Sequence, residues 1–321
     1  MEAVRVHAAA ALMMATVSIA SLAADVRKET AVEKKAAPDT HDASEKQAVL
    51  WSKLRARIEA VDQALDGVMG VAVKDLTTGA TIELRPDELF PQASSIKLAV
   101  LYELFRQAEE GRIDLAQVTR PGVPRVAGGG VLQVLGDKVS LTWRDLAVLM
   151  MGWSDNEATN VLIDKLGLDA VNRRLDGLGL ARTRLQRRMM DLEAARAGRE
   201  NVSTPSEMLH LAETLYHGTG LSVQRAKDLV AVASVEKDSP FRSPLPAGLK
   251  VMDKPGSLEG VRCVAAVVDL PGRPYAAAIM TTYLRRDEDG AAAIREVSAA
   301  LFQTFDRLAR ASAHGRVISE R

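Results

Sequence analysis

The spacing of apolar residues changes twice along the chain and separates a central helical region from strand-rich ends. From Trp51 onward, apolar residues recur every three or four positions up to Leu65, which predicts a helix that ends at Gly67. Two short apolar runs follow, 68–76 and 80–84, and the turn between them indicates a hairpin. Near the other end, three more such runs are separated by glycine and proline: 249–254, 262–270 and 275–284.

Between these ends the pattern is mainly helical. Helices are predicted at 94 to about 111, 142–151, 157–166, 169–177 and 206–216, with a closing amphipathic helix at 291–311. The segment 182–201 has no clean period and is expected to be a long surface loop. This order predicts an α/β (α+β) fold, in which a five-stranded antiparallel sheet is assembled from both chain ends and flanked by helices. An all-α insert, about 98–245, would separate the two halves of the sheet.

The first residues differ from the rest of the chain. Residues 8–23 form an uncharged apolar run that ends in small residues at the spacing that signal peptidase accepts. We therefore expect a signal peptide at 1–23 and a secreted or periplasmic protein; an uncleaved anchor is the alternative, because the run is near the lower length limit for spanning. The rest of the chain is expected to divide into a flexible tether at 24–47, a main domain at 48–312 and a C-terminal tail at 313–321.

Composition places the chain among ordinary globular proteins. Of its 321 residues, 47% are apolar and 26% are charged, and 42 basic residues balance 42 acidic ones. Zero net charge, with no basic block interleaved with aromatic residues, argues against a nucleic-acid partner. The single cysteine, Cys263, excludes an intramolecular disulfide, and its apolar neighbours predict a buried, inert thiol. The five histidines show no metal-ligand spacing, and no segment after the first is apolar enough to cross a membrane.

The most informative motif is Ser94-Ser95-Ile96-Lys97, at the start of an apolar helix. A serine one helical turn before a lysine places both side chains on one face. If that helix end is buried, the lysine loses its charge more easily and can accept the proton of the serine. The serine N–H would also be free in the first turn and could hold an oxyanion. Alone, the motif is weak, and a capping serine with a solvated lysine explains it better than a catalytic pair.

Two further motifs follow in the order that this chemistry needs. Ser154-Asp155-Asn156 falls between two predicted helices, where a loop can present a hydroxyl and an amide to a cleft, although all three residue types are also common helix caps. Lys254-Pro255-Gly256-Ser257 ends a predicted strand and could be a simple turn. With Ser94 and Lys97 they form the set S-x-x-K, S-D-N and K-x-G. On these motifs the chain resembles the class A β-lactamases and their relatives among the penicillin-binding proteins.

The resemblance covers about Trp51 to Ala311 and implies a β-lactamase/transpeptidase-like fold. It also implies the catalytic roles. Ser94 would attack a strained lactam or peptide-like carbonyl, and Lys97, if neutral, would accept its proton. Ser154 would then relay a proton to the departing nitrogen.

The same resemblance implies the substrate-binding residues. Asn156 would hold the amide side chain of the substrate, and Lys254 would supply positive potential for its carboxylate. The N–H of Ser257, together with that of the nucleophile, would complete an oxyanion hole. Arg262, early in the next predicted strand, resembles the arginine that helps to bind the substrate carboxylate. Asp155 is expected to brace its loop rather than touch the substrate.

Two positions depart from the family pattern. Class A enzymes carry a glutamate in the long loop after S-D-N that activates the water for release of the acyl group, and ungapped counting puts Met190 at that position. Methionine cannot move a proton. A shift of one residue could bring Asp191 inward as the base, although the asparagine expected soon afterwards is replaced by Ala194. A loop brace or a surface charge is the alternative role for Asp191. The second departure is Pro255, where the family has a threonine or serine, so that a hydroxyl contact is lost.

These residues predict a serine hydrolase acylated at Ser94, which hydrolyses β-lactam amide bonds and releases the product slowly unless Asp191 serves as base. The alternatives are a D,D-peptidase, amidase or esterase acting on peptidoglycan fragments, and a non-hydrolytic penicillin-binding sensor. This chemistry needs no cofactor and no metal. The expected partner is a small-molecule β-lactam or a peptidoglycan-like peptide. We expect a monomer with no stable membrane span after signal cleavage.

Overall fold

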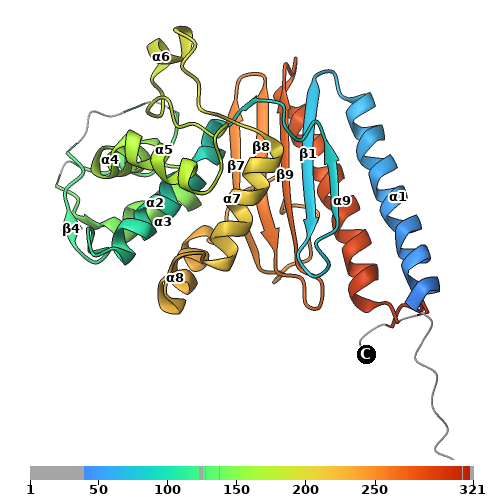
Figure 1. Ribbon diagram of the computed structural model, residues 1–321. Coiled ribbons are helices and arrows are strands. Elements are labelled where there is room, and N and C mark those ends of the chain that lie inside the picture. The colour runs from blue at the N-terminus through green and yellow to red at the C-terminus, as the bar shows by residue number, and fades with distance from the viewer. Residues whose placement is uncertain (1–39, 123–125, 127, 137, 313, 319–321) are drawn as a thin grey trace, which may run out of the picture. The chain divides into compact units, whose positions relative to one another are not determined.

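A five-stranded antiparallel sheet lies at the centre of the computed structural model (Figure 1), which describes residues 40–122, 126, 128–136, 138–312 and 314–318. Its strands run in the order β2-β1-β9-β8-β7, which makes β7 an edge strand. Their bounds are β1 (Val68–Asp75), β2 (Thr81–Leu84), β7 (Val251–Leu258), β8 (Val261–Val268) and β9 (Tyr275–Thr282). The predicted antiparallel sheet from both chain ends is therefore confirmed.

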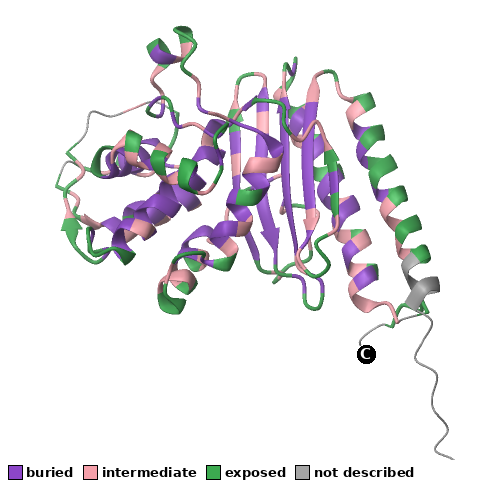
Figure 2. Cartoon of the chain, viewed as in Figure 1, coloured by how far each residue is buried: buried purple, intermediate pink, exposed green. Residues whose placement is uncertain are grey.

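The two faces of the sheet are covered by different sets of helices. Neighbouring residues of a strand point to opposite faces, so Val71 and Val73 of β1 belong to one hydrophobic core and Ala72 to the other. Two long helices, α1 (Thr40–Ala64) and α9 (Asp287–Arg310), lie side by side over the first face (Figure 1). Figure 2 shows that the sheet is buried on both faces, whereas the outer side of α1 is exposed.

The other face carries the helical region. Its helices are α2 (Lys97–Glu109), α3 (Trp143–Gly152), α4 (Asn156–Leu166), α5 (Leu168–Gly177), α6 (Leu192–Arg196), α7 (Pro205–His217) and α8 (Val223–Ala233). Two pairs of short strands accompany these helices: β3 (Phe90–Pro91) with β6 (Val202–Ser203), and β4 (Val118–Thr119) with β5 (Leu141–Thr142). Two 3-10 turns, Ala93–Ile96 and Leu132–Val134, also occur here. Among the described residues between α2 and α8, the strands β4, β5 and β6 are each two residues long.

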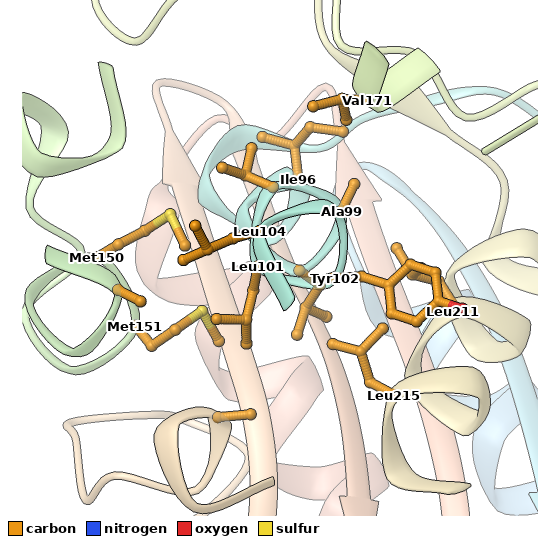
Figure 3. Packing of buried hydrophobic residues seen from close by; sticks show 14 of the residues in the cluster. Ile96, Ala99, Leu101, Tyr102, Leu104, Met150, Met151, Val171, Leu211 and Leu215 are labelled. Carbon is orange, nitrogen blue, oxygen red and sulfur yellow. The ribbon is translucent and has the colours of Figure 1, made fainter. Parts of the chain in front are cut away.

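Helix α2 is buried on nearly all sides and is the axis of this region. Figure 3 shows Met150 and Met151 of α3 on one side of it and Leu211 and Leu215 of α7 on another, with Tyr102 facing α7. Its buried residues include the polar Lys97, Glu103 and Gln107 as well as apolar side chains, so the helix lies inside the core on nearly all its sides. Because α2 is held by its neighbours, the turn that opens it is held as well, and this turn carries the Ser-x-x-Lys motif.

Two boundaries and one helix differ from the sequence-based expectation. Helix α1 begins at Thr40, so the tether predicted to end at residue 47 is wrong for its last eight residues, which are rich in the helix formers Ala, Glu, Lys and Gln. Strand β7 continues to Leu258 instead of ending at Lys254, because an edge strand tolerates the proline at 255. Helix α8 was not predicted, although its sequence is amphipathic and it buries Leu229, Val232 and Ala233. The predicted signal peptide at 1–23 and the tether up to residue 39 lie outside the described residues.

The segment 182–201 is less exposed than a surface loop. Thr183 and Leu185 are fully buried, and Arg187 is nearly so and forms an ion pair with Glu200 (2.7 Å). Asn160 of α4 binds the backbone of this segment in both directions, donating to Met189 O (3.1 Å) and accepting from Met189 N (2.8 Å). The prediction of a loop was right, but buried polar side chains hold it in place. Among the described residues, no helix is both long enough and apolar enough to cross a membrane.

Candidate active site

The turn that carries Ser94 is held tightly against strand β7. Ser94 lies in the 3-10 turn Ala93–Ile96, in which Ala93 has a left-handed backbone (φ 46°). A side chain at Gly256 of β7 could not be accommodated, since its Cβ would come within 2.6 Å of Gln92 O, 2.5 Å of Cys263 Sγ and 3.0 Å of Ser94 N. Glycine at position 256 therefore lets β7 approach the backbone of the nucleophile.

A hydrogen-bonded chain joins Ser94 to Lys97 through a third residue. Ser154 Oγ lies 2.9 Å from Ser94 Oγ, and Lys97 Nζ donates to Ser154 Oγ at 3.0 Å and to Ser154 O at 2.7 Å. No hydrogen bond joins Lys97 directly to Ser94 among the described residues. Hydroxyl groups can donate to one neighbour and accept from another, so the chain can carry a proton from Ser94 to Lys97.

The environment of Lys97 favours its neutral form. The side chain is completely buried, and this burial holds its pKa well below the ordinary value for lysine; the nearby charge of Lys254 lowers the pKa further, while Asp155 opposes both. Lys97 also donates to Asn156 Oδ1 at 3.0 Å. A neutral amine at this point can act as a proton acceptor.

The loop between α3 and α4 presents Ser154 and Asn156 to the same point. Ser154 has a left-handed backbone (φ 53°). The buried carboxylate of Asp155 accepts from Ala158 N at the start of α4 (2.9 Å) and from Leu132 N (2.8 Å), so it braces the loop, as the sequence analysis expected. The side-chain amide of Asn156 donates to Gly128 O (3.2 Å).

These residues open onto a cleft of about 870 Å³. Strand β7 forms one wall of the cleft with Lys254, Pro255, Gly256 and Ser257. Lys254 is 1% exposed, and its Nζ has no hydrogen bond or ion pair to any described residue. Burial, and then the charge of a second lysine, Lys237, lower the pKa of Lys254 to about 7, against the opposing effect of Asp253. The cleft therefore holds a cation that a bound anion would stabilise.

Met190 lines the cleft and Asp191 does not. Met190 has a left-handed backbone (φ 62°), and its Sδ and the amide nitrogen of Asn156 lie next to the same point above Gly128. Asp191 is the N-cap of α6, where its Oδ1 accepts from Ala194 N at 2.9 Å. The geometry gives no support to Asp191 as a catalytic base, because the carboxylate is engaged in capping and is absent from the cleft wall.

Arg262 lines the cleft but is already bound to its own protein. Its guanidinium donates to Leu258 O and Val261 O, both at 2.9 Å, and forms an ion pair with Asp287 at 3.0 Å. A carboxylate ligand would have to share this guanidinium with Asp287. Cys263, beside it on β8, is buried as predicted, and burial raises the pKa of its thiol to about 11.

The sequence analysis missed several residues of the cleft wall. Gly128, in a triple-glycine segment with positive φ (94°), accepts from Asn156, and a run of glycines is the signal that could have indicated a close backbone approach. Trp153, the residue before Ser154, lines the cleft and is 57% exposed. Lys237 lies in an irregular segment, where no periodicity or motif marks it. Within the described residues, no group of three or more His, Cys, Asp or Glu side chains is arranged to hold a metal ion.

Comparisons with known proteins identify relatives of this arrangement. A family model described as the beta-lactamase enzyme family matches residues 53–305. A β-lactamase of Streptomyces cellulosae is 30% identical over 234 residues, which cover 70% of this chain and 75% of that protein. The β-lactamase CARB-3 of Pseudomonas aeruginosa is 27% identical, with 68% of this chain and 77% of that protein covered.

Solved structures show the same fold. An ancestral class A β-lactamase superimposes with a TM-score of 0.73 at 28% identity, covering 78% of this chain and all of that one. The structure of PBP-A superimposes with a TM-score of 0.71 at 27% identity, covering 79% and 96%. A PBP-A mutant in which a leucine is replaced by glutamate matches equally well and was solved as an acyl-enzyme complex with penicillin G.

Proposed function

We propose a fast and a slow step for this chain, which belongs to the beta-lactamase enzyme family and is a β-lactamase-type serine hydrolase. β-Lactams acylate Ser94 rapidly, and the acyl group leaves Ser94 slowly. One observation carries the proposal for acylation: the hydrogen-bonded chain from Ser94 through Ser154 to a buried lysine whose neutral form is favoured. The proposal of slow release rests on Met190, which cannot accept a proton and stands where the resemblance predicts a glutamate.

In the acylation step, Ser94 Oγ attacks the lactam carbonyl carbon. Its proton passes to Ser154 Oγ as the proton of Ser154 passes to the neutral Lys97 Nζ, so that no isolated charge forms on either hydroxyl. The negative charge that develops on the carbonyl oxygen would be held by the N–H groups of Ser94 and Ser257. The close approach of β7 at Gly256 supports this assignment, since it brings the two backbones together.

Collapse of the tetrahedral intermediate breaks the bond between the carbonyl carbon and the lactam nitrogen. The nitrogen takes a proton from Ser154 Oγ, which is reprotonated by Lys97, and an ester to Ser94 remains. Lys254 would hold the carboxylate of the substrate during both steps, because it is buried, unpaired and open to the cleft. Asn156 would contact the amide side chain of the substrate.

Release of the acyl group needs a water molecule and a base to activate it. Met190 occupies the cleft wall where the resemblance predicts a glutamate, and methionine has no group that accepts a proton at neutral pH. The carboxylate of Asp191 caps α6 and does not line the cleft. We therefore expect the ester to Ser94 to accumulate, because general base catalysis is typically worth about 10²–10⁴ in rate.

A second candidate function is a D,D-peptidase or penicillin-binding protein acting on peptidoglycan-like peptides. The methionine at 190 favours it, as does the likeness to PBP-A, of which a mutant with a leucine replaced by glutamate was solved with penicillin G as an acyl-enzyme. Both candidates use the same acylation chemistry and differ in what happens to the ester. We also propose that the chain is exported through its apolar N-terminal run, which the sequence analysis identified as a signal peptide.

Stopped-flow measurement with a chromogenic cephalosporin tests the proposal. Slow release predicts one rapid turnover per enzyme molecule, followed by a much slower steady state. Fast linear turnover without accumulated acyl-enzyme would overturn it. Both candidates predict the burst, and rapid cleavage of peptides that end in D-Ala-D-Ala, combined with slow release of the β-lactam, would replace the first candidate with the second.

A further inference from the structure

Lys237 lies in the connection between α8 and β7 and is buried, although this connection lines the cleft. Its side chain is 3% exposed. Its Nζ donates to Ala233 O at the end of α8 (2.9 Å), to Asp253 O (3.1 Å) and to Asp253 Oδ1 (3.3 Å). An ammonium group has three donors, so all of them are used within the protein. Lys237 therefore holds two segments together and has no donor left for a ligand.

Asp253 is the residue immediately before Lys254, on the edge strand of the sheet. Its carboxylate is completely buried, and its Oδ1 accepts from Arg242 Nε (2.8 Å) as well as from Lys237. Strand β7 pairs only with β8, so the backbone groups on its other edge have no partner strand. On this edge, Lys237 Nζ donates to the carbonyl oxygen of Asp253. The strand is thus tied to α8 one residue ahead of the cleft lysine.

The charges in this cluster do not balance. Lys237 and Arg242 both bind one buried carboxylate, that of Asp253. Lys254 points to the other face of β7, but its charge lies close enough for the same carboxylate to raise its pKa. Lys254 is the cation left without a partner among the described residues. A buried cation without a partner either loses its proton or binds an anion.

We propose that Lys237 is a positioning residue for Lys254: it ties β7 to α8 and occupies Asp253, which leaves Lys254 as an unpaired cation whose partner is the substrate carboxylate. The proposal deepens the function proposed above and rests on it. It concerns a residue that touches no substrate and acts only through its neighbours.

The groups around Lys254 set the direction of the pH dependence. Lys97 faces it from α2, Lys237 from the α8–β7 connection and Cys263 from β8, and Asp253 precedes it on β7. The other charged groups on the cleft wall are Arg187, Glu236, Asp238 and Arg262. Arg242 binds Asp253. Because the pKa of Lys254 is about 7, its charge is present below that pH and is lost above it. Acylation by a carboxylate-bearing substrate should therefore decline as the pH rises through about 7.

Removal of the Lys237 charge should move this decline to higher pH for two reasons. A like charge next to Lys254 is lost, and Asp253, with one partner fewer, attracts Lys254 more strongly. Both effects stabilise protonated Lys254. The expected shift of the alkaline midpoint is roughly 0.5–1 pH unit.

The test is the second-order rate constant for labelling Ser94 with penicillin, measured against pH in Lys237→Met, Lys237→Arg and the unmodified protein. Lys250→Met is the matched control, because Lys250 is an exposed lysine in the segment that leads into β7. We expect the midpoint to move up in Lys237→Met only, whereas the arginine variant and the control keep the original profile.

Three results would overturn the inference. The first is an unchanged midpoint in Lys237→Met, and the second is an equal shift in Lys250→Met. The third is a rate in the unmodified protein that does not fall above about pH 7, and this result decides the matter even if Lys237→Met does not fold. Absence of any labelling of Ser94 in the unmodified protein would overturn the proposed function as well, which separates the two failures.

Discussion

Replacement of Met190 by glutamate should turn a slowly releasing acyl-enzyme into a faster hydrolase. Met190 lies on the cleft wall, and its thioether and the Asn156 amide border the same point above Gly128. A glutamate has a similar length and would place a carboxylate beside that amide. Asn156 in turn binds Lys97 at 3.0 Å, so the new carboxylate would join the same network.

The size of the effect follows from the chemistry that is added. A positioned general base typically contributes about 10²–10⁴ in rate, equivalent to roughly 3–5 kcal/mol in the barrier. The lower end is expected here, because Ala194 offers no side-chain amide to orient the water. The left-handed backbone at position 190 (φ 62°) strains methionine and glutamate alike, so the exchange adds little backbone cost.

The assay is the lifetime of the penicillin adduct on Ser94, followed by intact mass after removal of free penicillin. The matched control is Met190→Gln, which has nearly the same shape as the glutamate variant and no basic group. We expect Met190→Glu to shorten the lifetime by about two orders of magnitude and Met190→Gln to leave it unchanged. The reasoning is refuted if the two variants release the adduct equally fast.

Two further predictions test the geometry around the nucleophile. Ser154→Ala should slow the labelling of Ser94 by roughly 10²–10⁴, because it removes the only link to Lys97 among the described contacts, and labelling within twofold of the original rate would show that the lysine reaches the nucleophile directly. Gly256→Ala should lower the free energy of unfolding by about 1–3 kcal/mol in denaturant titrations, since the added Cβ would lie 3.0 Å from Ser94 N and closer still to two other atoms. Gly177→Ala is its control, with no atom within 4 Å of the added Cβ, and equal stability of the two variants would contradict the close approach of β7.

Most of the fold was predictable because its elements bury simple patterns. Strands β1, β8 and β9 are mainly apolar, and most of their residues are buried on both faces of the sheet. The boundaries were harder to predict where the pattern gave no sign. The start of α1 depends on helix propensity in a polar segment, and the extension of β7 past Pro255 depends on its place at the sheet edge.

The candidate site was predictable as far as its motifs reach. Ser94, Lys97, Ser154 and Lys254 were selected from three short motifs, and the fold brings them to one cleft. The link through Ser154 depends on distances that no sequence pattern contains. For the same reason, the sequence could not decide between a base and a loop brace at Asp191, which caps α6.

Other contributors to the cleft have no sequence signal at all. Lys237 acts through a carbonyl and a carboxylate that are remote from it in the chain, and its segment has no period. Arg262 lines the cleft, and its pairing with Asp287 at the start of α9 appears only once the chain is folded. Long-range pairing of charged side chains is set by the tertiary structure and not by local pattern.

The most direct test of the account is intact-mass analysis after brief exposure to penicillin, with Ser94→Ala as the control. The account predicts a mass increase of one intact penicillin molecule on the unmodified protein, which persists after free penicillin is removed, and no increase on Ser94→Ala. Equal labelling of Ser94→Ala, or no adduct on a folded unmodified protein that leaves penicillin intact, would contradict the central claim that Ser94 is the acylated nucleophile.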